Sequence, residues 1–340
     1  MDKMQSRRAF LRWTPATMSI VGLASVLGCS ENEVPVSPAA EKEEKRYKAA
    51  FSNAGLQATW CAHGMDTAVQ WGNWLGVDVT VYDSQFSIEK QRRDVEDMAT
   101  KDWDFVAIQA YGIKTLEEPV KRLIGKGTPV IDMDTRIVPA GEDIGLWTFV
   151  TPDHEKLAEL TTEVITERMG YKGRVVHTQG ALAHSGAQLR AQGFRNVVKK
   201  YPDIEVIDEQ PGDWDISKVA RIWDDLLVKH KQIDGAFLHN DDMAMAAVRA
   251  VRRSGQKREI VFGSIDAQDV GINGVIDGDL VVSAMNPAGR IHWTALMIGY
   301  FACAMNQKKS EVPSEVIIDS PVVTKDNAES FKYIMRNKLI

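Results

Sequence analysis

The residues best suited to chemistry are Asn240, Asp241 and Asp242, which directly follow the short apolar run 236–238. That run predicts a buried strand, and the apolar spacing after Asp242 predicts one buried face of a helix. Ligands of open α/β sheets bind where strands end and helices begin. An Asn in that position offers a donor and an acceptor to adjacent ligand hydroxyls. The alternative is that Asn240 only caps the helix by accepting a backbone hydrogen bond.

The neighbouring carboxylates could be read as a pair for acid–base work. At a helix N-terminus, however, Asp241 and Asp242 more often cap the helix and complement its dipole. Cys61 and His63 are too close together and too few for a structural zinc site. No nucleophile elbow, phosphate-binding loop or dinucleotide fingerprint appears. The sequence therefore predicts no catalytic residues, no metal and no cofactor.

The elements that must position these residues alternate regularly between strand and helix from Tyr47 onward. A strand of β-branched residues at 77–82 is followed by a charged amphipathic helix at 88–99, and the same rhythm returns after a break near 147–152. Alternation of this kind is typical of βαβ units, which form parallel sheets with helices on both faces. The break predicts two doubly wound α/β domains.

The first 46 residues are not expected to belong to these domains. Ser6-Arg7-Arg8-Ala9-Phe10-Leu11 has the form of a twin-arginine export signal, and Val26-Leu27-Gly28-Cys29 resembles a lipobox. We therefore expect Cys29 to be the lipidation site, with residues 30–46 forming a flexible tether rich in Glu and Pro. The alternative is an ordinary secretory signal with an unrelated Cys29. Once Cys29 carries lipid, a disulfide between Cys61 and Cys303 stays an open question.

Composition and charge argue against a nucleic-acid-binding protein. The chain has 340 residues, enough for two domains, with 44% hydrophobic and 26% charged residues. Its formal net charge is −6, with both signs scattered along the sequence, which gives no support for nucleic-acid binding. Contact with a membrane is expected through the lipid anchor only.

From about Lys48 onward the chain resembles the type I periplasmic solute-binding proteins, in particular the ribose/galactose-type sugar-binding family. Four stretches carry the resemblance: 129–134 (PVIDMD), 190–194 (RAQGF), 239–244 (HNDDMA) and Asp266 after 262–265 (FGSI). The resemblance implies two lobes joined by a three-segment hinge, with crossovers near Thr151, Asn286 and Ser320. The N-terminal lobe would comprise 47–150 and 290–319, and the C-terminal lobe 151–286 and 321–340.

The resemblance also implies ligand-binding residues, carried over one position at a time. They are carboxylates that accept from hydroxyls, a forked guanidinium, a stacking aromatic and two amides: Asp134, Asp266, Arg190, Trp214, Asn240 and Asn286. In the ribose subgroup an Arg directly follows the first Asp, whereas here Thr135 stands there and Arg136 comes one later. This departure leaves the ligand's identity open.

The first strand and helix depart further from the family pattern. Ser52 and Asn53 end the first strand and are plausible hydrogen-bonding partners of the ligand. Trp60 is the best candidate for a second stacking aromatic, and the alternative is that it belongs to the core of the first helix.

The function implied by the resemblance is capture of a small sugar or polyol by hinge closure, without breaking a bond, for the permease of an ABC importer. A lipid-anchored monomer in the periplasm is expected. The alternatives are a sensor that presents its ligand to a membrane receptor and, less favoured, a sugar-modifying enzyme that uses Asp134 and Asp266 as acid and base.

Overall fold

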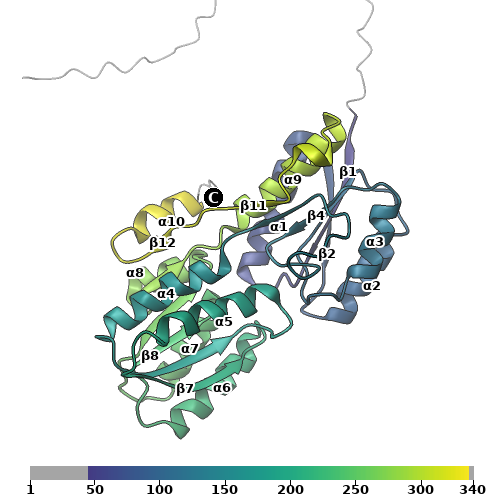
Figure 1. Cartoon of the computed structure of the whole chain (residues 1–340). Helices are drawn as coiled ribbons and strands as arrows, with labels where there is room; N and C mark the ends of the chain where they lie inside the picture. Colours follow the sequence, from purple (N-terminus) through teal and green to yellow (C-terminus); the bar gives the residue numbers. More distant parts are fainter. Residues whose placement is uncertain (1–44, 337–340) are drawn as a thin grey trace, which may run out of the picture. The chain divides into compact units, whose positions relative to one another are not determined.

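The computed structural model describes residues 45–336, so the export signal, Cys29 and most of the tether lie outside the described residues. The predicted fold class is confirmed: the chain forms two α/β lobes, each built on a six-stranded sheet (Figure 1). The first sheet is parallel throughout its order β11-β5-β4-β3-β1-β2. In chain order its strands are β1 (Tyr47–Asn53), β2 (Val77–Asp83), β3 (Phe105–Ile108), β4 (Val130–Met133), β5 (Thr148–Thr151) and β11 (Glu315–Ile317).

The second sheet has the order β12-β10-β9-β8-β6-β7, in which only the pairing of β10 with β12 is antiparallel. Its strands are β6 (Gly173–Gln179), β7 (Ile204–Pro211), β8 (Gly235–Leu238), β9 (Val261–Ile265), β10 (Val282–Ala284) and β12 (Val322–Val323).

Helices cover both faces of each sheet because successive strand residues point to opposite sides. On β1, Phe51 faces the core beneath α1 (Thr59–Leu75) and α9 (Ala288–Ala304), whereas Ala50 faces the core beneath α2 (Ile88–Met98) and α3 (Glu117–Gly125). The second sheet is covered in the same way, by α4 (His154–Arg168) and α5 (Ser185–Val198) on one face and by the remaining helices on the other. These are α6 (Ile216–Lys229), α7 (Asp241–Arg253), α8 (Asp269–Asp277) and α10 (Ala328–Arg336).

The chain passes between the two sheets three times: from β5 to α4, from β10 to α9, and from β11 to β12. Helix α9 returns to the first sheet, where it packs on α1, β3 and β4. Apart from β12, the strands of each sheet run parallel, so their carboxyl ends lie together in the region between the lobes. Asp134, Asn240, Asp266 and Asn286 each follow directly after, or soon after, such a strand end.

Within residues 45–336, no helix combines the length and the apolar character needed to cross a membrane.

Candidate functional site

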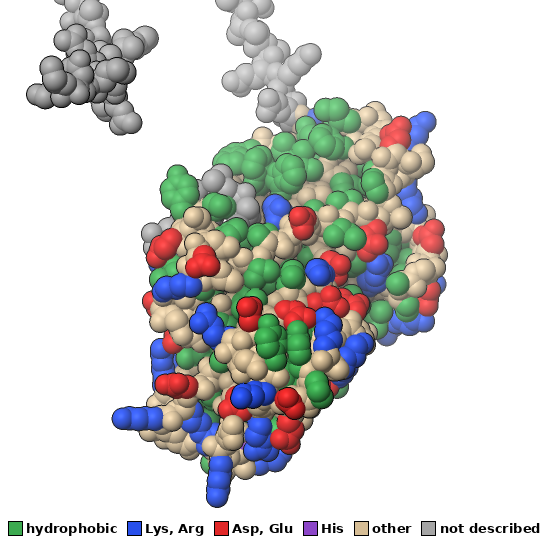
Figure 2. All heavy atoms as spheres, turned by 60° about the vertical axis from the view of Figure 1, so that its left-hand side comes forward, with side chains coloured by type: hydrophobic (Ala, Val, Ile, Leu, Met, Phe, Trp, Pro, Cys, Tyr) green, Lys and Arg blue, Asp and Glu red, His purple; other side chains and the backbone are tan. Residues whose placement is uncertain are grey.

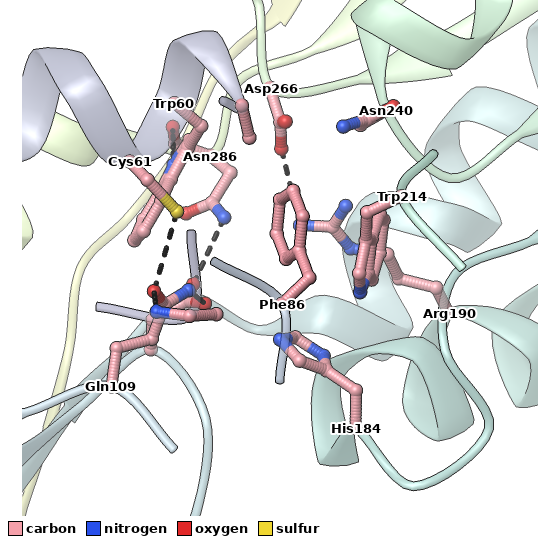
Figure 3. A pocket seen from close by; sticks show the side chains of 13 residues that line it. Trp60, Cys61, Phe86, Gln109, His184, Arg190, Trp214, Asn240, Asp266 and Asn286 are labelled. Atoms are coloured by element: carbon pink, nitrogen blue, oxygen red, sulfur yellow. Dashed lines mark hydrogen bonds and ion pairs between the residues drawn. The ribbon is translucent and has the colours of Figure 1, made fainter. Parts of the chain in front are cut away.

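A pocket lies between the two lobes and encloses about 350 Å³ of unoccupied space, including the part open to solvent. Figure 3 shows side chains from both lobes converging on it. The lining residues are Ala54, Ala58, Trp60, Cys61, Phe86, Gln109, Asp134, His184, Arg190, Trp214, Asn240, Asp266 and Asn286.

Asp134 provides the carboxylate on the side of the first lobe. It follows β4 with a left-handed φ of 62°, a conformation that turns the chain at the strand end. Its two carboxylate oxygens accept hydrogen bonds from Gln109 Nε2 at 2.9 Å and from Asn286 Nδ2 at 3.0 Å. Burial by itself raises the pKa of Asp134, but the nearby His154, His184 and Arg190 outweigh it and hold the pKa below its usual range. The pocket therefore contains a fixed, ionised acceptor.

Gln109 was not predicted as a site residue, and it holds this side of the pocket together. It stands directly after β3, so the rule that ligands bind at strand ends could have identified it. Its Oε1 accepts from the Ala54 backbone N–H at 3.2 Å and from Cys61 Sγ at 3.5 Å, while its Nε2 donates to Asp134. One buried amide thus links the ends of β1, β3 and β4.

On the side of the second lobe, Arg190 and Asp266 form a buried ion pair. Arg190 projects from α5 and donates from Nη2 to Asp266 Oδ1 at 3.3 Å, from Nη1 to the His239 carbonyl, and from Nε to His154 Nδ1 at 3.3 Å. Burial raises the pKa of Asp266 well above its ordinary value, and the charge of Arg190 offsets this only in part. The bonds to His154 and to the His239 carbonyl hold the guanidinium in place. Because Arg190 is held in this way, its third bond fixes the position of Asp266.

Asn240 combines the two roles that the sequence left open. Its Oδ1 accepts from the Met243 backbone N–H at 2.9 Å, which caps α7, and the residue also lines the pocket. The cap uses one lone pair of the carbonyl oxygen, and the two N–H groups of Nδ2 are the donors that Asn240 offers a ligand.

Asp241 positions its neighbours and does not line the pocket. It accepts from Ser264 Oγ at 2.5 Å, from Ser283 Oγ at 2.6 Å and from the Gln268 backbone N–H at 2.8 Å. These bonds hold the loop that carries Asp266, whose own φ is 118°. Burial raises the pKa of Asp241 to about 7, although the three hydrogen bonds act in the opposite direction.

Three aromatic side chains line the pocket: Trp60, Phe86 and Trp214. Trp214 lies against Gly180, where an added Cβ would come within 2.0 Å of the indole, and its ring packs edge-on against His184 at 5.1 Å. Trp60 belongs to the core and to the lining at once, since it is 4% exposed and donates from Nε1 to the Asn286 carbonyl at 2.9 Å. Phe86 was not predicted as a site residue. It lies in the loop after β2 with a left-handed φ of 55°, and no spacing pattern in the sequence predicts that conformation.

His184, also not predicted, lines the pocket and caps α5 by accepting from the Ala187 backbone N–H at 3.3 Å. Burial lowers the pKa of His184 to about 3, so the ring is neutral at physiological pH.

Four predicted residues do not line this pocket. Ser52 and Asn53 are fully buried at the end of β1, where Ser52 Oγ accepts from Gln91 and Asn53 contacts Cys61 and His292. The side chain of Thr135 donates to the Ala110 carbonyl at 2.6 Å. Arg136 points elsewhere, stacking over Phe149 and pairing with Glu315 at 2.7 Å.

The lobes also contact each other around the pocket. Asp242 accepts hydrogen bonds from Thr59, His63 Nδ1 lies 2.9 Å from Gln268 Oε1, and the Ile113 N–H donates to the Ala183 carbonyl at 3.0 Å. In the described part of the chain, no three His, Cys, Asp or Glu side chains are placed to hold a metal ion. Cys61 and Cys303 are free thiols.

Comparisons with known proteins agree with this architecture. A family model described as periplasmic binding protein domain matches residues 49–308. The xylitol-binding protein of Mycolicibacterium smegmatis is 25% identical over 292 residues, which cover 86% of this chain and 80% of that protein. The ribose import binding protein RbsB of Escherichia coli is 27% identical over 218 residues, which cover 64% of this chain and 72% of RbsB.

Among solved structures, the periplasmic binding component of an arabinose ABC transporter from Shewanella sp. ANA-3 superposes with a TM-score of 0.79. Its sequence identity is 19%, and the match covers 86% of this chain and 96% of that one. At that identity the likeness concerns the fold alone.

Proposed function

The chain belongs to the periplasmic binding protein family, type I, and from this premise we propose that it captures a small neutral sugar or polyol between its lobes for an ABC importer. The observation that carries the proposal is the pocket's composition. Acceptors, amide donors and a guanidinium from both lobes converge beside three aromatic rings. Vicinal hydroxyls both donate and accept, and the apolar C–H faces of a sugar or polyol pack on aromatic planes.

The charges in the pocket favour a neutral ligand. Asp134 stays ionised, and Arg190 pairs its charge with Asp266 and uses two further donors on His154 and the His239 carbonyl. A ligand carboxylate or phosphate would face the charge of Asp134, while the charge of Arg190 is already balanced by Asp266, so the desolvation cost would be high. The relatives named for xylitol and ribose fit this ligand class.

Two unpaired polar atoms support binding rather than a purely structural network. Asn286 Oδ1 and Trp214 Nε1 are buried without a hydrogen-bond partner in the described chain, although both residues line the pocket. A buried polar atom without a partner costs about 1–3 kcal/mol. Hydroxyls of a bound polyol would supply an O–H to the first atom and an acceptor to the second.

We propose that closure of the lobes around the ligand is the mechanism, and that the protein is exported and held at the membrane by lipid on Cys29. Contacts between Thr59 and Asp242 and between His63 and Gln268 join the lobes across the cleft, and opening of the cleft would break them. The ligand would then be enclosed by groups that no single lobe provides.

Isothermal titration of the purified protein with neutral pentoses, pentitols, hexoses and inositols tests the ligand class. We expect micromolar or tighter binding of at least one of these compounds and no conversion of it, with uronic acids and sugar phosphates as matched negative controls. Asp134→Asn should reduce the affinity. Binding of only the acidic compounds would overturn the proposal, and chemical conversion of the bound sugar would point to an enzyme.

A further inference from the structure

Helix α9 has an uncharged face that its own lobe covers only in part. From Ile291 to Gln307 the sequence contains no Asp, Glu, Lys or Arg. One side of the helix packs in the core of the first lobe through Ile291, Ala295 and Leu296. On the other side, Trp293 and, just beyond the helix, Met305 are exposed. Met297, Tyr300 and Phe301 are half-buried there, and Tyr300 also packs against that core. A helix that is apolar all round normally has protein or lipid on every side.

The last turns of α1 extend this face with two further tryptophans. Trp71 lies 4.9 Å from Trp74 and 6.0 Å from Trp293, measured between ring centroids. Trp74 is 65% exposed, Met305 67% and Trp293 37%. We call the residues Trp71, Trp74, Trp293, Met297, Tyr300, Phe301 and Met305 the α1–α9 patch. Figure 2 shows hydrophobic side chains gathered at the top of the molecule, the height at which Figure 1 places α9.

The described chain begins beside this patch. The Tyr47 ring packs edge-on against Tyr300 at 5.9 Å, and the Tyr47 N–H donates to the Gly76 carbonyl, two residues after Trp74. Cys29 precedes Lys45 by sixteen residues, which reach at most about 55 Å when fully extended. A lipid on Cys29 would therefore keep the patch within this distance of a bilayer.

We propose that the α1–α9 patch rests on the membrane surface and orients the anchored protein there. This inference depends on the lipid anchor that belongs to the proposed function. Tryptophan and tyrosine favour the bilayer interface, where the ring is apolar and the N–H or O–H stays hydrated. Lys45, whose Nζ lies 4.9 Å from the centre of the Tyr47 ring, adds a cation at headgroup level.

The position of the patch leaves the binding cleft accessible. Helix α1 begins at Thr59, at the cleft contact with Asp242, and Trp74 lies fifteen residues later. At 1.5 Å per residue the cleft end of the helix is about 22 Å from Trp74 along the axis. A protein resting on the patch would hold its cleft away from the lipid, where it can take up ligand.

Tryptophan quenching by lipid tests the contact. The lipidated full chain is reconstituted into vesicles of phosphatidylethanolamine and phosphatidylglycerol, with some acyl chains brominated. We expect the vesicles to quench part of the tryptophan fluorescence, and the double variant Trp74→Phe/Trp293→Phe to lose at least half of that quenching. Trp103→Phe, on the opposite face of the first sheet, is the matched control and should leave the quenching unchanged.

Flotation of the vesicles and ligand titration on the same samples separate the possible failures. Protein that floats and binds ligand but shows no quenching dependent on Trp74 and Trp293 overturns the membrane contact and leaves the proposed function intact. Protein that does not float overturns both the anchor and the contact. Dimers formed through a Trp74→Cys disulfide, without quenching, would assign the patch to a second copy and also overturn the proposal.

Discussion

Asp242 caps a helix that belongs to the other lobe. Its Oδ2 accepts from the backbone N–H of Thr59 at 2.9 Å and from Thr59 Oγ1 at 3.0 Å. Thr59 is the first residue of α1, and the preceding Ala58 supplies no side-chain cap of its own. Asp242 stands two residues after Asn240, which lines the pocket. Closing the cleft therefore satisfies donors of α1 that are otherwise left to water.

Removing this contact should speed up ligand release. In Asp242→Ala the closed state loses a carboxylate that accepts two bonds at an exposed position, a contribution of about 1 kcal/mol. We expect roughly fivefold weaker binding, expressed mainly in the dissociation rate measured by stopped flow. Asp225→Ala, an exposed carboxylate on α6, is the matched control. An unchanged dissociation rate in Asp242→Ala would mean that the contact contributes nothing to closure.

Trp214→Phe should lower ligand affinity because it removes contacts with the ligand, in addition to any loss of protein stability. Trp214 is 9% exposed and packs on Gly180, so truncation to Ala would also cost core packing, about 3–5 kcal/mol for a buried tryptophan. The Phe variant keeps an apolar ring but loses stacking area and the Nε1 donor, and we expect a three- to tenfold loss of affinity by titration.

Trp223→Phe provides the comparison, because Trp223 is fully buried in the same core and bonds to Thr178 away from the pocket. It should lower the melting temperature and leave the affinity unchanged. Equal losses of affinity in both variants would show that Trp214 acts only through packing.

The sequence predicted the fold better than it predicted the pocket lining. Hydrophobic periodicity is local, so the alternation of strands and helices could be read directly. The direction of a polar side chain at a strand end depends on its partners. Asn53 hydrogen-bonds to the Cys61 carbonyl and to the His292 ring inside the first lobe, and no spacing rule predicts these partners. Phe86 enters the lining through a left-handed backbone conformation that only the folded loop specifies.

Buried histidines should make the protein less stable in mild acid. Burial lowers the pKa of His184 to about 3, whereas in the unfolded chain it is near 6.5. Between these values the unfolded state binds more protons, so stability falls as the pH is lowered. His184→Asn keeps an N-cap for α5 and removes the titrating ring.

Urea unfolding at pH 7, 6 and 5 measures this effect. The free energy of unfolding of the wild type should fall relative to that of His184→Asn by up to about 1.4 kcal/mol per pH unit below pH 6.5. Burial raises the pKa of Asp241 to about 7, so this residue increases the free energy of unfolding as the pH is lowered. Both proteins contain Asp241, so its contribution cancels in the difference between them. A constant difference across these pH values would contradict a neutral, buried His184.

Asn240 and Asp266 should act on one ligand from neighbouring strand ends, the first as a donor and the second as an acceptor. Asn240→Ser keeps an oxygen for the α7 cap and removes the free Nδ2, so affinity should fall with little change in stability. Asp266→Asn removes the charge that pairs with Arg190, and we expect a ten- to hundredfold loss. Because both residues contact the same ligand, the double variant should lose less than the sum of the two. Titration of all four proteins with the identified ligand measures the coupling, and strict additivity would place the two residues on separate contacts.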